Sequence, residues 1–318
     1  REEADLDLEA VDFAPEGSAR RAEDIVRQLM HQFSTVGFLK LTNVEGFDEA
    51  RYLKACKAFH ALPSAKKQAM YLKKDAPGHS NVYRGYHPFC SNDASHKEMY
   101  DEGLPTDLVA HTEWEQYFLY EKAPWPEDAD GDLQWIRDEF DRNLQIFYGV
   151  GRRLARYIAL GLQKSADFFE PWFADGSLST FRTIHYLPRT AGVVDSSLLD
   201  PSEARLVTPP HTDSGLMTIL CTFGNPGLQV QVDSGGSQSY RSVGAAGPNE
   251  LTVNLGDVFA RITGYRLKAT SHQVVDIGRE RYSSALFLDP RYSAHLPTPG
   301  VGCPALLDDP RWELAPVW

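Results

Sequence analysis

His211 and Asp213 lie two positions apart, and a second histidine, His272, follows much later in the chain. On a β-strand, side chains two residues apart share a face, so His211 and Asp213 converge while Thr212 faces away. We expect residues 268–275 to form another short strand that brings His272 across to this pair. Two imidazoles and one carboxylate can hold Fe(II) and leave coordination positions open. The pattern therefore predicts a metal site with these three ligands, and zinc, which accepts the same atoms, is the rival ion.

Arg281 and Ser283 form another pair with the same spacing, shortly after His272. On a strand they would offer a guanidinium fork and a hydroxyl to a carboxylate beside the metal. The apolar run 285–288 follows at once, so we expect Arg281 to be buried, and a buried cation needs an anion. A zinc hydrolase has no obvious use for this pair, which favours Fe(II).

The order His-x-Asp, His, Arg-x-Ser resembles that of the 2-oxoglutarate-dependent Fe(II) dioxygenases of the isopenicillin N synthase-like group. Segments similar to the strands that flank the iron in this family occur in the same order, at 215–220, 227–230, 253–257 and 281–290. The N-terminal half is similar more loosely, through segments 37–39, 59–63, 84–86 and 97–103. The resemblance therefore covers most of the chain.

The resemblance implies that Arg281 binds the distal carboxylate of 2-oxoglutarate, with hydrogen bonds from Ser283 and Tyr186. The Asn-x-Tyr-Pro segment of the family is here Ile184-His185-Tyr186-Leu187-Pro188, so the tyrosine is retained and the asparagine is not. Asn254 resembles a family residue near the iron, and we expect Asp257 to order the turn that follows.

Substrate contacts are predicted on the strand of Tyr186 and in nearby loops. Alternation places Arg182 and Ile184 on the face of Tyr186, whereas His185 points the other way. We expect His185 to pack in the core or to support the residues that bind ligands, and not to bind the metal. Arg182 could hold an anionic group of the substrate or form a structural ion pair. Further candidates lie in segments expected at the pocket mouth: Arg84, Tyr86, His87 and His111.

The resemblance implies that 2-oxoglutarate and O2 are consumed at Fe(II), that succinate and CO2 are released, and that a C–H bond of a small metabolite is oxidised. The expected substrate bears a carboxylate and belongs to specialised metabolism, the outcome is hydroxylation, desaturation or oxidative cyclisation, and ascorbate should stimulate turnover. Two alternatives stay open: an isopenicillin N synthase-like oxidase that does not use 2-oxoglutarate, and a catalytically silent metabolite-binding module. Halogenation is disfavoured, because halogenating relatives replace the carboxylate ligand that Asp213 provides here.

Composition restricts the class of partner. The chain has 318 residues, 42% of them hydrophobic, and a formal net charge of −12. This charge argues against a surface for nucleic acid or anionic membranes, because such binding depends on Lys and Arg. No apolar run approaches the roughly 20 residues of a membrane span, and the four cysteines are scattered, as free thiols would be: Cys56, Cys90, Cys221 and Cys303. We expect a cytoplasmic monomer that acts on a small molecule.

The elements that must position these residues follow from periodicity and from the resemblance. Apolar spacing predicts helices over 19–34, 48–62 and 133–162, a buried strand over 38–44 and irregular loops over 73–108. The resemblance implies an α+β fold with a mainly β core, a double-stranded β-helix (jelly roll) with supporting helices packed on one sheet. We expect residues 1–318 to form one elaborated catalytic domain: a family N-terminal region at about 1–125, a long supporting helix region at 126–175, the jelly-roll core with the iron and 2-oxoglutarate site at 176–295 and a C-terminal tail at 296–318.

Overall fold

The computed structural model describes residues 5–15, 19–72, 81, 83–90, 95–104, 121–126, 131, 133–174, 176–188, 206–234, 236–297 and 314–316. Within these ranges the helices are α1 (Ala19–Thr35), α2 (Glu49–His60), α3 (Ser64–Ala69), α4 (Gln134–Gly161), η2 (Glu170–Trp172) and α5 (Asp257–Ile262). The strands are β1 (Ala10–Asp12), β2 (Phe38–Thr42), β3 (Gly85–His87), β4 (Lys97–Gly103), β5 (Thr180–Tyr186), β6 (Leu206–His211), β7 (Met217–Cys221), β8 (Leu228–Ser234), β9 (Ser237–Ser242), β10 (Leu251–Leu255), β11 (His272–Val275), β12 (Arg281–Leu288), β13 (His295–Pro297) and β14 (Leu314–Pro316).

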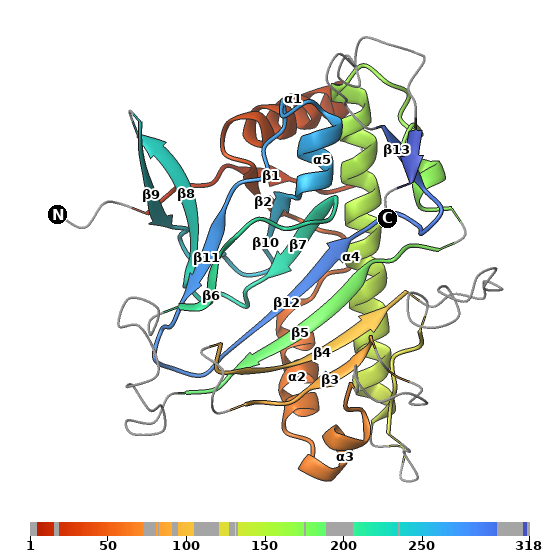
Figure 1. Ribbon diagram of the computed structural model, residues 1–318, viewed down its shortest axis with the longest axis vertical. Helices are drawn as coiled ribbons and strands as arrows, with labels where there is room; N and C mark the ends of the chain where they lie inside the picture. Colours follow the sequence, from red (N-terminus) through yellow and green to blue (C-terminus); the bar gives the residue numbers. More distant parts are fainter. Residues whose placement is uncertain are drawn as a thin grey trace.

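Two sheets form the centre of the fold (Figure 1). The large sheet has the strand order β1-β2-β10-β7-β12-β5-β4-β3, and the small sheet has the order β6-β11-β8-β9. Apolar side chains from both sheets meet between them: Phe38 of β2 lies in one cluster with Val230 of β8, and Ile184 of β5 lies in another with Val207 of β6. The predicted α+β jelly roll with a mainly β core is confirmed.

The helices pack on the opposite face of the large sheet. α4 contacts β7 and β12, α2 contacts β12, and α1 contacts β2. Their apolar stripes supply an aromatic core in which Tyr52 of α2 and Phe147 of α4 both pack against Phe181 of β5. The three predicted helices agree with α1, α2 and α4 to within two residues at each end, and the side chain of Asp48 caps α2 by accepting a hydrogen bond from the backbone N–H of Arg51.

Two glycines of α4 test how closely this helix approaches the sheet. A Cβ at Gly151 would lie 3.0 Å from Leu288 Cδ2 and 3.2 Å from Ile219 Cδ1, whereas a Cβ at Gly149 would meet no atom within 4 Å. We therefore expect Gly151→Val to lower the free energy of unfolding by about 1–3 kcal/mol through overpacking. The control Gly149→Ala should raise it by about 0.5–1 kcal/mol, because alanine favours the helix. Urea denaturation of both variants measures the difference, and a Gly151→Val variant as stable as the parent would contradict the close packing.

The structure corrects the prediction of irregular loops over 73–108. Strands β3 and β4 lie in this region and complete one edge of the large sheet. The alternating hydrophobic pattern of a strand is missing from β4, because polar side chains are buried on both of its faces, including Glu98, Asp101 and Glu102. The C-terminal segment predicted as a tail also contributes a strand, since β14 pairs with β13.

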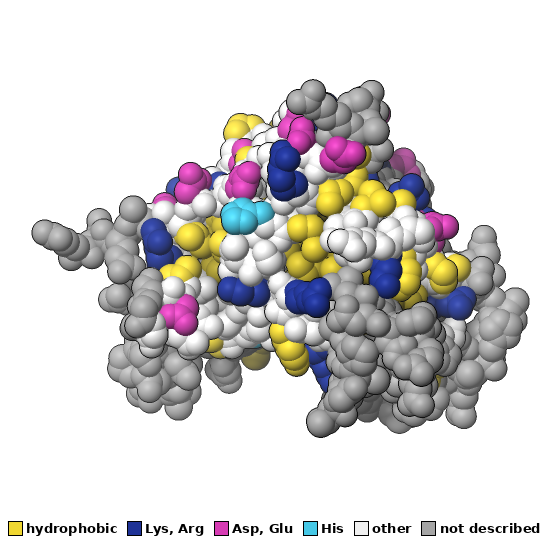
Figure 2. All heavy atoms as spheres, turned by 90° about the horizontal axis from the view of Figure 1, so that it is seen from above, with side chains coloured by type: hydrophobic (Ala, Val, Ile, Leu, Met, Phe, Trp, Pro, Cys, Tyr) yellow, Lys and Arg dark blue, Asp and Glu magenta, His cyan; other side chains and the backbone are white. Residues whose placement is uncertain are grey.

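The described surface mixes both signs of charge. On the face seen from above in Figure 2, Lys and Arg side chains are interspersed with Asp, Glu and apolar side chains, so the acidic excess of the sequence is not gathered into one patch there. Cys56, Cys90 and Cys221 are free thiols, as predicted, and Cys303 lies outside the described residues. None of the described helices combines the length and the apolar character that crossing a membrane requires.

Candidate active site

The structure brings the three predicted metal ligands together between the two sheets. His211 ends β6 and His272 begins β11, where the two residues are direct cross-strand partners. His211 Nε2 lies 3.6 Å and His272 Nε2 lies 3.8 Å from Asp213 Oδ1. Asp213 follows β6 by two residues rather than lying on the strand, so the predicted convergence is correct while the strand is shorter than expected.

Each imidazole is oriented by its own strand. His211 Nδ1 lies 2.8 Å from the carbonyl oxygen of Pro209, and His272 Nδ1 lies 3.1 Å from that of Thr270. An Nδ1–H donated to a carbonyl fixes the tautomer and leaves Nε2 with a free lone pair, as metal-binding histidines require. Both Nε2 atoms face the same carboxylate oxygen, so the two rings fit a shared cation.

The second oxygen of Asp213 is held by neutral donors. Asp213 Oδ2 accepts hydrogen bonds from Thr218 Oγ1 at 2.5 Å and from Asn254 Nδ2 at 2.7 Å. Burial acts to raise the pKa of this carboxyl group, but the adjacent His211 and His272 side chains and the two neutral donors outweigh burial and hold the pKa below its usual value. The result is an ionised carboxylate with one free oxygen beside two imidazoles. This mixed N/O set suits Fe(II) and leaves coordination positions open.

Arg281 reaches the same cavity, of about 150 Å³, in which the three residues lie. Side chains alternate along β5 and β12, so every second residue of these strands faces the cavity. Six of the lining residues come from β5, β12 and β10: Arg182, Ile184, Tyr186, Arg281, Ser283 and Asn254.

The environment of Arg281 requires an anion. Its side chain is buried, its Nη1 donates to the carbonyl oxygen of Pro226 at 3.2 Å, and its guanidinium lies 3.8 Å from the ring centroid of Tyr186. None of the carboxylates in the described ranges forms an ion pair with it. A Cβ at Gly227, where φ is +120°, would lie 3.1 Å from Arg281 Nη1, so glycine makes room for this guanidinium. With no carboxylate partner among the described residues, this buried cation favours an anionic ligand.

Lys97 is a second cation of this cavity that sequence reasoning did not select. Its Nζ lies 5.7 Å from the ring centroid of Tyr186 and 3.5 Å from Thr208 Oγ1. Burial acts to raise the pKa of the Tyr186 phenol, but the charges of Lys97 and Arg281 outweigh it and lower that pKa. Residues 97–103 were part of the family resemblance, but the position of Lys97 depends on β4 pairing with β5, which had not been predicted.

A larger cavity, of about 400 Å³, adjoins the first and shares His211, Asp213 and Arg182 with it. Asp101 binds Arg182 through two hydrogen bonds, of 2.6 Å to Nε and 2.7 Å to Nη2, and lies 3.1 Å from His87 Nε2. Arg182 therefore takes part in an ion pair, one of the two alternatives that the sequence left open. His87 lines this cavity as predicted.

Two predicted substrate contacts lie elsewhere. Arg84 is buried and donates to the carbonyl oxygens of Glu102 and Ser179, and it lines neither cavity. Tyr86 is a neighbour of His87 on β3 and so points to the opposite face of the sheet, where its hydroxyl donates to Glu98. Both were expected in loops at the pocket mouth. Tyr86 lies on β3 instead, and Arg84, in the bend before β3, is turned into the protein by its hydrogen bonds. His111 lies outside the described residues.

Comparison with known proteins identifies the family. The model of the 2OG-Fe(II) oxygenase superfamily matches residues 182–290, and the model of the N-terminal region of non-haem dioxygenases in morphine synthesis matches residues 8–135. A 2-oxoglutarate-Fe(II) type oxidoreductase of Aspergillus fumigatus is 30% identical over 263 residues, which are 79% of this chain and 72% of the relative. The chain belongs to the 2-oxoglutarate-Fe(II) oxygenase superfamily.

Solved structures agree in fold with this member of the superfamily. A full-length Neurospora crassa protein, solved in complex with alpha-KG and thymine, superimposes with a TM-score of 0.76 at 22% identity, covering 97% of this chain and 93% of that one. A putative 2OG-Fe(II) oxygenase family protein from Caulobacter crescentus gives 0.73 at 24% identity, with 97% and 95% coverage. The predicted class, a 2-oxoglutarate-dependent Fe(II) oxidoreductase with Fe(II) and 2-oxoglutarate as cofactor and co-substrate, is confirmed.

Proposed function

We propose that His211, Asp213 and His272 bind Fe(II), and that Arg281 binds the distal carboxylate of 2-oxoglutarate. The observation that carries this assignment is the buried guanidinium, without a carboxylate partner among the described residues, in the same cavity as the three metal ligands. Ser283 and Tyr186 add hydroxyl donors to the same anchor. Lys97 adds a second positive charge.

When bound together, Fe(II), 2-oxoglutarate and O2 supply the oxidising power for a C–H bond, with release of succinate and CO2. The residues of the chain bind and orient the metal and the co-substrate and shield them from water. Asp213 stays ionised because donors hold its second oxygen, and the two imidazoles present Nε2 because their Nδ1 atoms are engaged. The burial of Arg281 and Ser283 keeps water from competing for the co-substrate carboxylate.

We propose that the substrate is a small metabolite that binds in the larger cavity, next to His211 and Asp213. The pair of Arg182 and Asp101, with His87 beside it, lines this cavity and can both donate and accept hydrogen bonds. We further propose that this metabolite bears a carboxylate and belongs to specialised metabolism. The outcome of the reaction is hydroxylation, desaturation or cyclisation. Five further expectations stay predictions: a single catalytic domain, a monomeric state, a cytoplasmic location, the absence of nucleic-acid partners and stimulation by ascorbate.

Succinate formation tests the proposed reaction. Purified protein with Fe(II), ascorbate and 2-oxoglutarate should release succinate, and a panel of small acids should reveal which compounds accelerate this release. O2 uptake with a substrate but without 2-oxoglutarate would instead favour the oxidase. No O2 uptake and no succinate under any condition would favour the binding module. Soaking the accelerating acids into anaerobic crystals then shows which C–H bond faces the metal.

The two neutral donors to Asp213 should tune metal affinity. We expect Asn254→Leu to weaken Fe(II) binding by about 10- to 100-fold, because partners that orient a metal ligand commonly contribute this much. Thr218→Val, which removes the other donor to Asp213 Oδ2, should act in the same direction. Equilibrium dialysis under anaerobic conditions measures the dissociation constant. If both variants bind Fe(II) as tightly as the parent, the carboxylate does not act as a ligand in the orientation seen here.

A further inference from the structure

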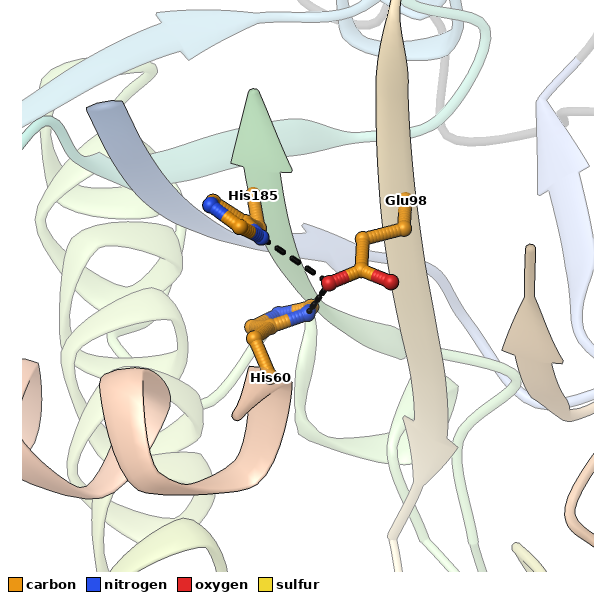
Figure 3. Close-up of side chains that lie close together, drawn as sticks. All are labelled: His60, Glu98 and His185. Atoms are coloured by element: carbon orange, nitrogen blue, oxygen red, sulfur yellow. Dashed lines mark hydrogen bonds and ion pairs between the residues drawn. The ribbon is translucent and has the colours of Figure 1, made fainter. Parts of the chain in front are cut away.

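Glu98 has four hydrogen-bond partners on the helix-covered face of the large sheet, and Figure 3 shows two of them, His60 and His185. His60 Nδ1 and His185 Nδ1 lie 3.1 Å and 2.9 Å from Glu98 Oε1. Lys67 Nζ donates to Glu98 Oε2 at 2.7 Å, and the hydroxyl of Tyr86 donates to the same oxygen. We call these five residues the Glu98 cluster. It joins α2, the α3 helix, β3, β4 and β5.

His185 extends the cluster to β12. Its Nε2 lies 2.8 Å from Glu280 Oε1, and its ring stacks on that of Tyr282 with centroids 4.5 Å apart and planes 3° apart. The hydroxyl of Tyr282 donates to the same oxygen of Glu280. Each ring nitrogen of His185 therefore lies within hydrogen-bond distance of a carboxylate oxygen, and the ring bridges Glu98 and Glu280.

Two imidazoles and a carboxylate also have the composition of a metal site. Here, however, both oxygens of Glu98 are already used, and one of their partners is the ammonium group of Lys67. A divalent cation would have to displace hydrogens from both histidines and would lie close to this positive charge. A hydrogen-bonded network explains all of the contacts, so we assign the cluster a structural connection to the active site and not an ion.

The register of the sheet supplies that connection. Glu98, His185 and Tyr282 are cross-strand neighbours in one row over β4, β5 and β12. The next row consists of Lys97, Tyr186 and Arg281, whose side chains point to the opposite face, into the active-site cavity. Each of these three is the terminal residue of its strand. Strand ends fray unless neighbouring contacts hold them. Glu98 and His185 lie in the row next to this terminal row, with their side chains on the other face of the sheet.

We propose that the Glu98 cluster positions the 2-oxoglutarate anchor. By tying the ends of three strands to α2 and α3, it holds Arg281 and Tyr186 at the separation that the co-substrate carboxylate needs. Glu98 and His185 are therefore positioning residues that act through Arg281. This inference rests on the proposed role of Arg281 and adds to it the reason why that guanidinium is held in place.

The test is the dissociation constant of 2-oxoglutarate for the Fe(II)-loaded protein, measured by anaerobic calorimetry. We expect Glu98→Gln to raise it about tenfold, the equivalent of losing one charge-assisted hydrogen bond, while Fe(II) binding changes less than about twofold. Glu280→Gln should raise it less, about threefold, and because Glu280 is largely exposed this variant does not put folding at risk. Unchanged 2-oxoglutarate affinity in both variants would overturn the inference.

A matched control separates positioning from general loss of stability. Tyr52→Phe removes a buried hydrogen bond of 2.7 Å to Ser284 Oγ on the same face of β12, away from the terminal row, and should leave 2-oxoglutarate affinity unchanged. An equal rise in Tyr52→Phe would show that any weakening of this face has the same effect, and would contradict the inference.

A double-variant cycle with Arg281→Met separates the proposed binding role of Arg281 from the proposed positioning role of Glu98. If Glu98 acts through Arg281, then Glu98→Gln has no further effect in the Arg281→Met background. If Arg281→Met alone leaves 2-oxoglutarate affinity unchanged, the proposed function of Arg281 fails. If Arg281→Met weakens binding and Glu98→Gln does not, the positioning inference fails alone. A second equivalent of bound metal in the parent protein that is lost in Glu98→Gln would also overturn it.

Discussion

Replacing Asp213 by alanine is expected to weaken Fe(II) binding by on the order of 100-fold or more, because groups that merely orient a metal ligand already contribute about 10- to 100-fold. The variant loses the ionised oxygen that lies between His211 Nε2 and His272 Nε2, and the two imidazoles that remain carry no charge to balance the cation. Succinate formation should fall in proportion to metal occupancy at low Fe(II). Anaerobic equilibrium dialysis and succinate assays over a range of Fe(II) concentrations measure both effects.

Asp257→Asn is the matched control for this variant. Asp257 is also close to the metal-binding segment, but its carboxylate accepts a hydrogen bond of 3.0 Å from Thr212, and neither residue lines the smaller cavity of Arg281 and the three predicted ligands. Asparagine retains an oxygen for that bond, so Fe(II) affinity should be unchanged. If Asp257→Asn loses the metal and Asp213→Ala keeps it, the ligand assignment is wrong.

Arg281→Met is expected to weaken binding of 2-oxoglutarate by roughly two to three and a half orders of magnitude, because removing one partner of a buried charge pair costs about 3–5 kcal/mol. The remaining donors, Ser283 and Tyr186, are neutral hydroxyls, and Lys97 offers only a point charge near the Tyr186 ring. Arg281→Lys should recover part of the affinity at most, since an ammonium group cannot reproduce the bidentate fork. The Michaelis constant for 2-oxoglutarate and the calorimetric dissociation constant should rise together.

The distal carboxylate itself provides the control on the ligand side. 2-Oxobutyrate keeps the keto-acid group and lacks that carboxylate, so the parent protein should prefer 2-oxoglutarate strongly, and Arg281→Met should remove most of the preference. Exposed Arg261, replaced by methionine, controls for the loss of a positive charge elsewhere and should leave the preference intact. A preference that survives in Arg281→Met would place the carboxylate away from this guanidinium.

Much of the site could be predicted from the sequence, because its signals are local. Two-residue spacing puts Arg281 and Ser283 on one face of β12, since the side chains of a strand alternate. It also keeps Asp213 close to His211, although Asp213 lies two residues beyond the end of β6. The same rule separates Tyr186, which faces the cavity, from His185, which faces the helices. Helix periodicity predicts α1, α2 and α4 for the same reason: each pattern repeats within the element itself.

Tertiary structure decided what depends on pairing between distant segments. Asp101 binds Arg182 across 81 residues of sequence, which turns a candidate substrate contact into an ion pair. Strand β4 has no local signature, because Glu98 and Asp101 are polar on opposite faces and are both buried by partners from other elements. Its pairing with β5 brings Lys97 to the cavity that Arg281 lines and places Glu98 on the opposite face of the sheet. A sequence specifies periodicity residue by residue, whereas the neutralisation of a buried charge becomes visible only when the fold has brought its partner alongside.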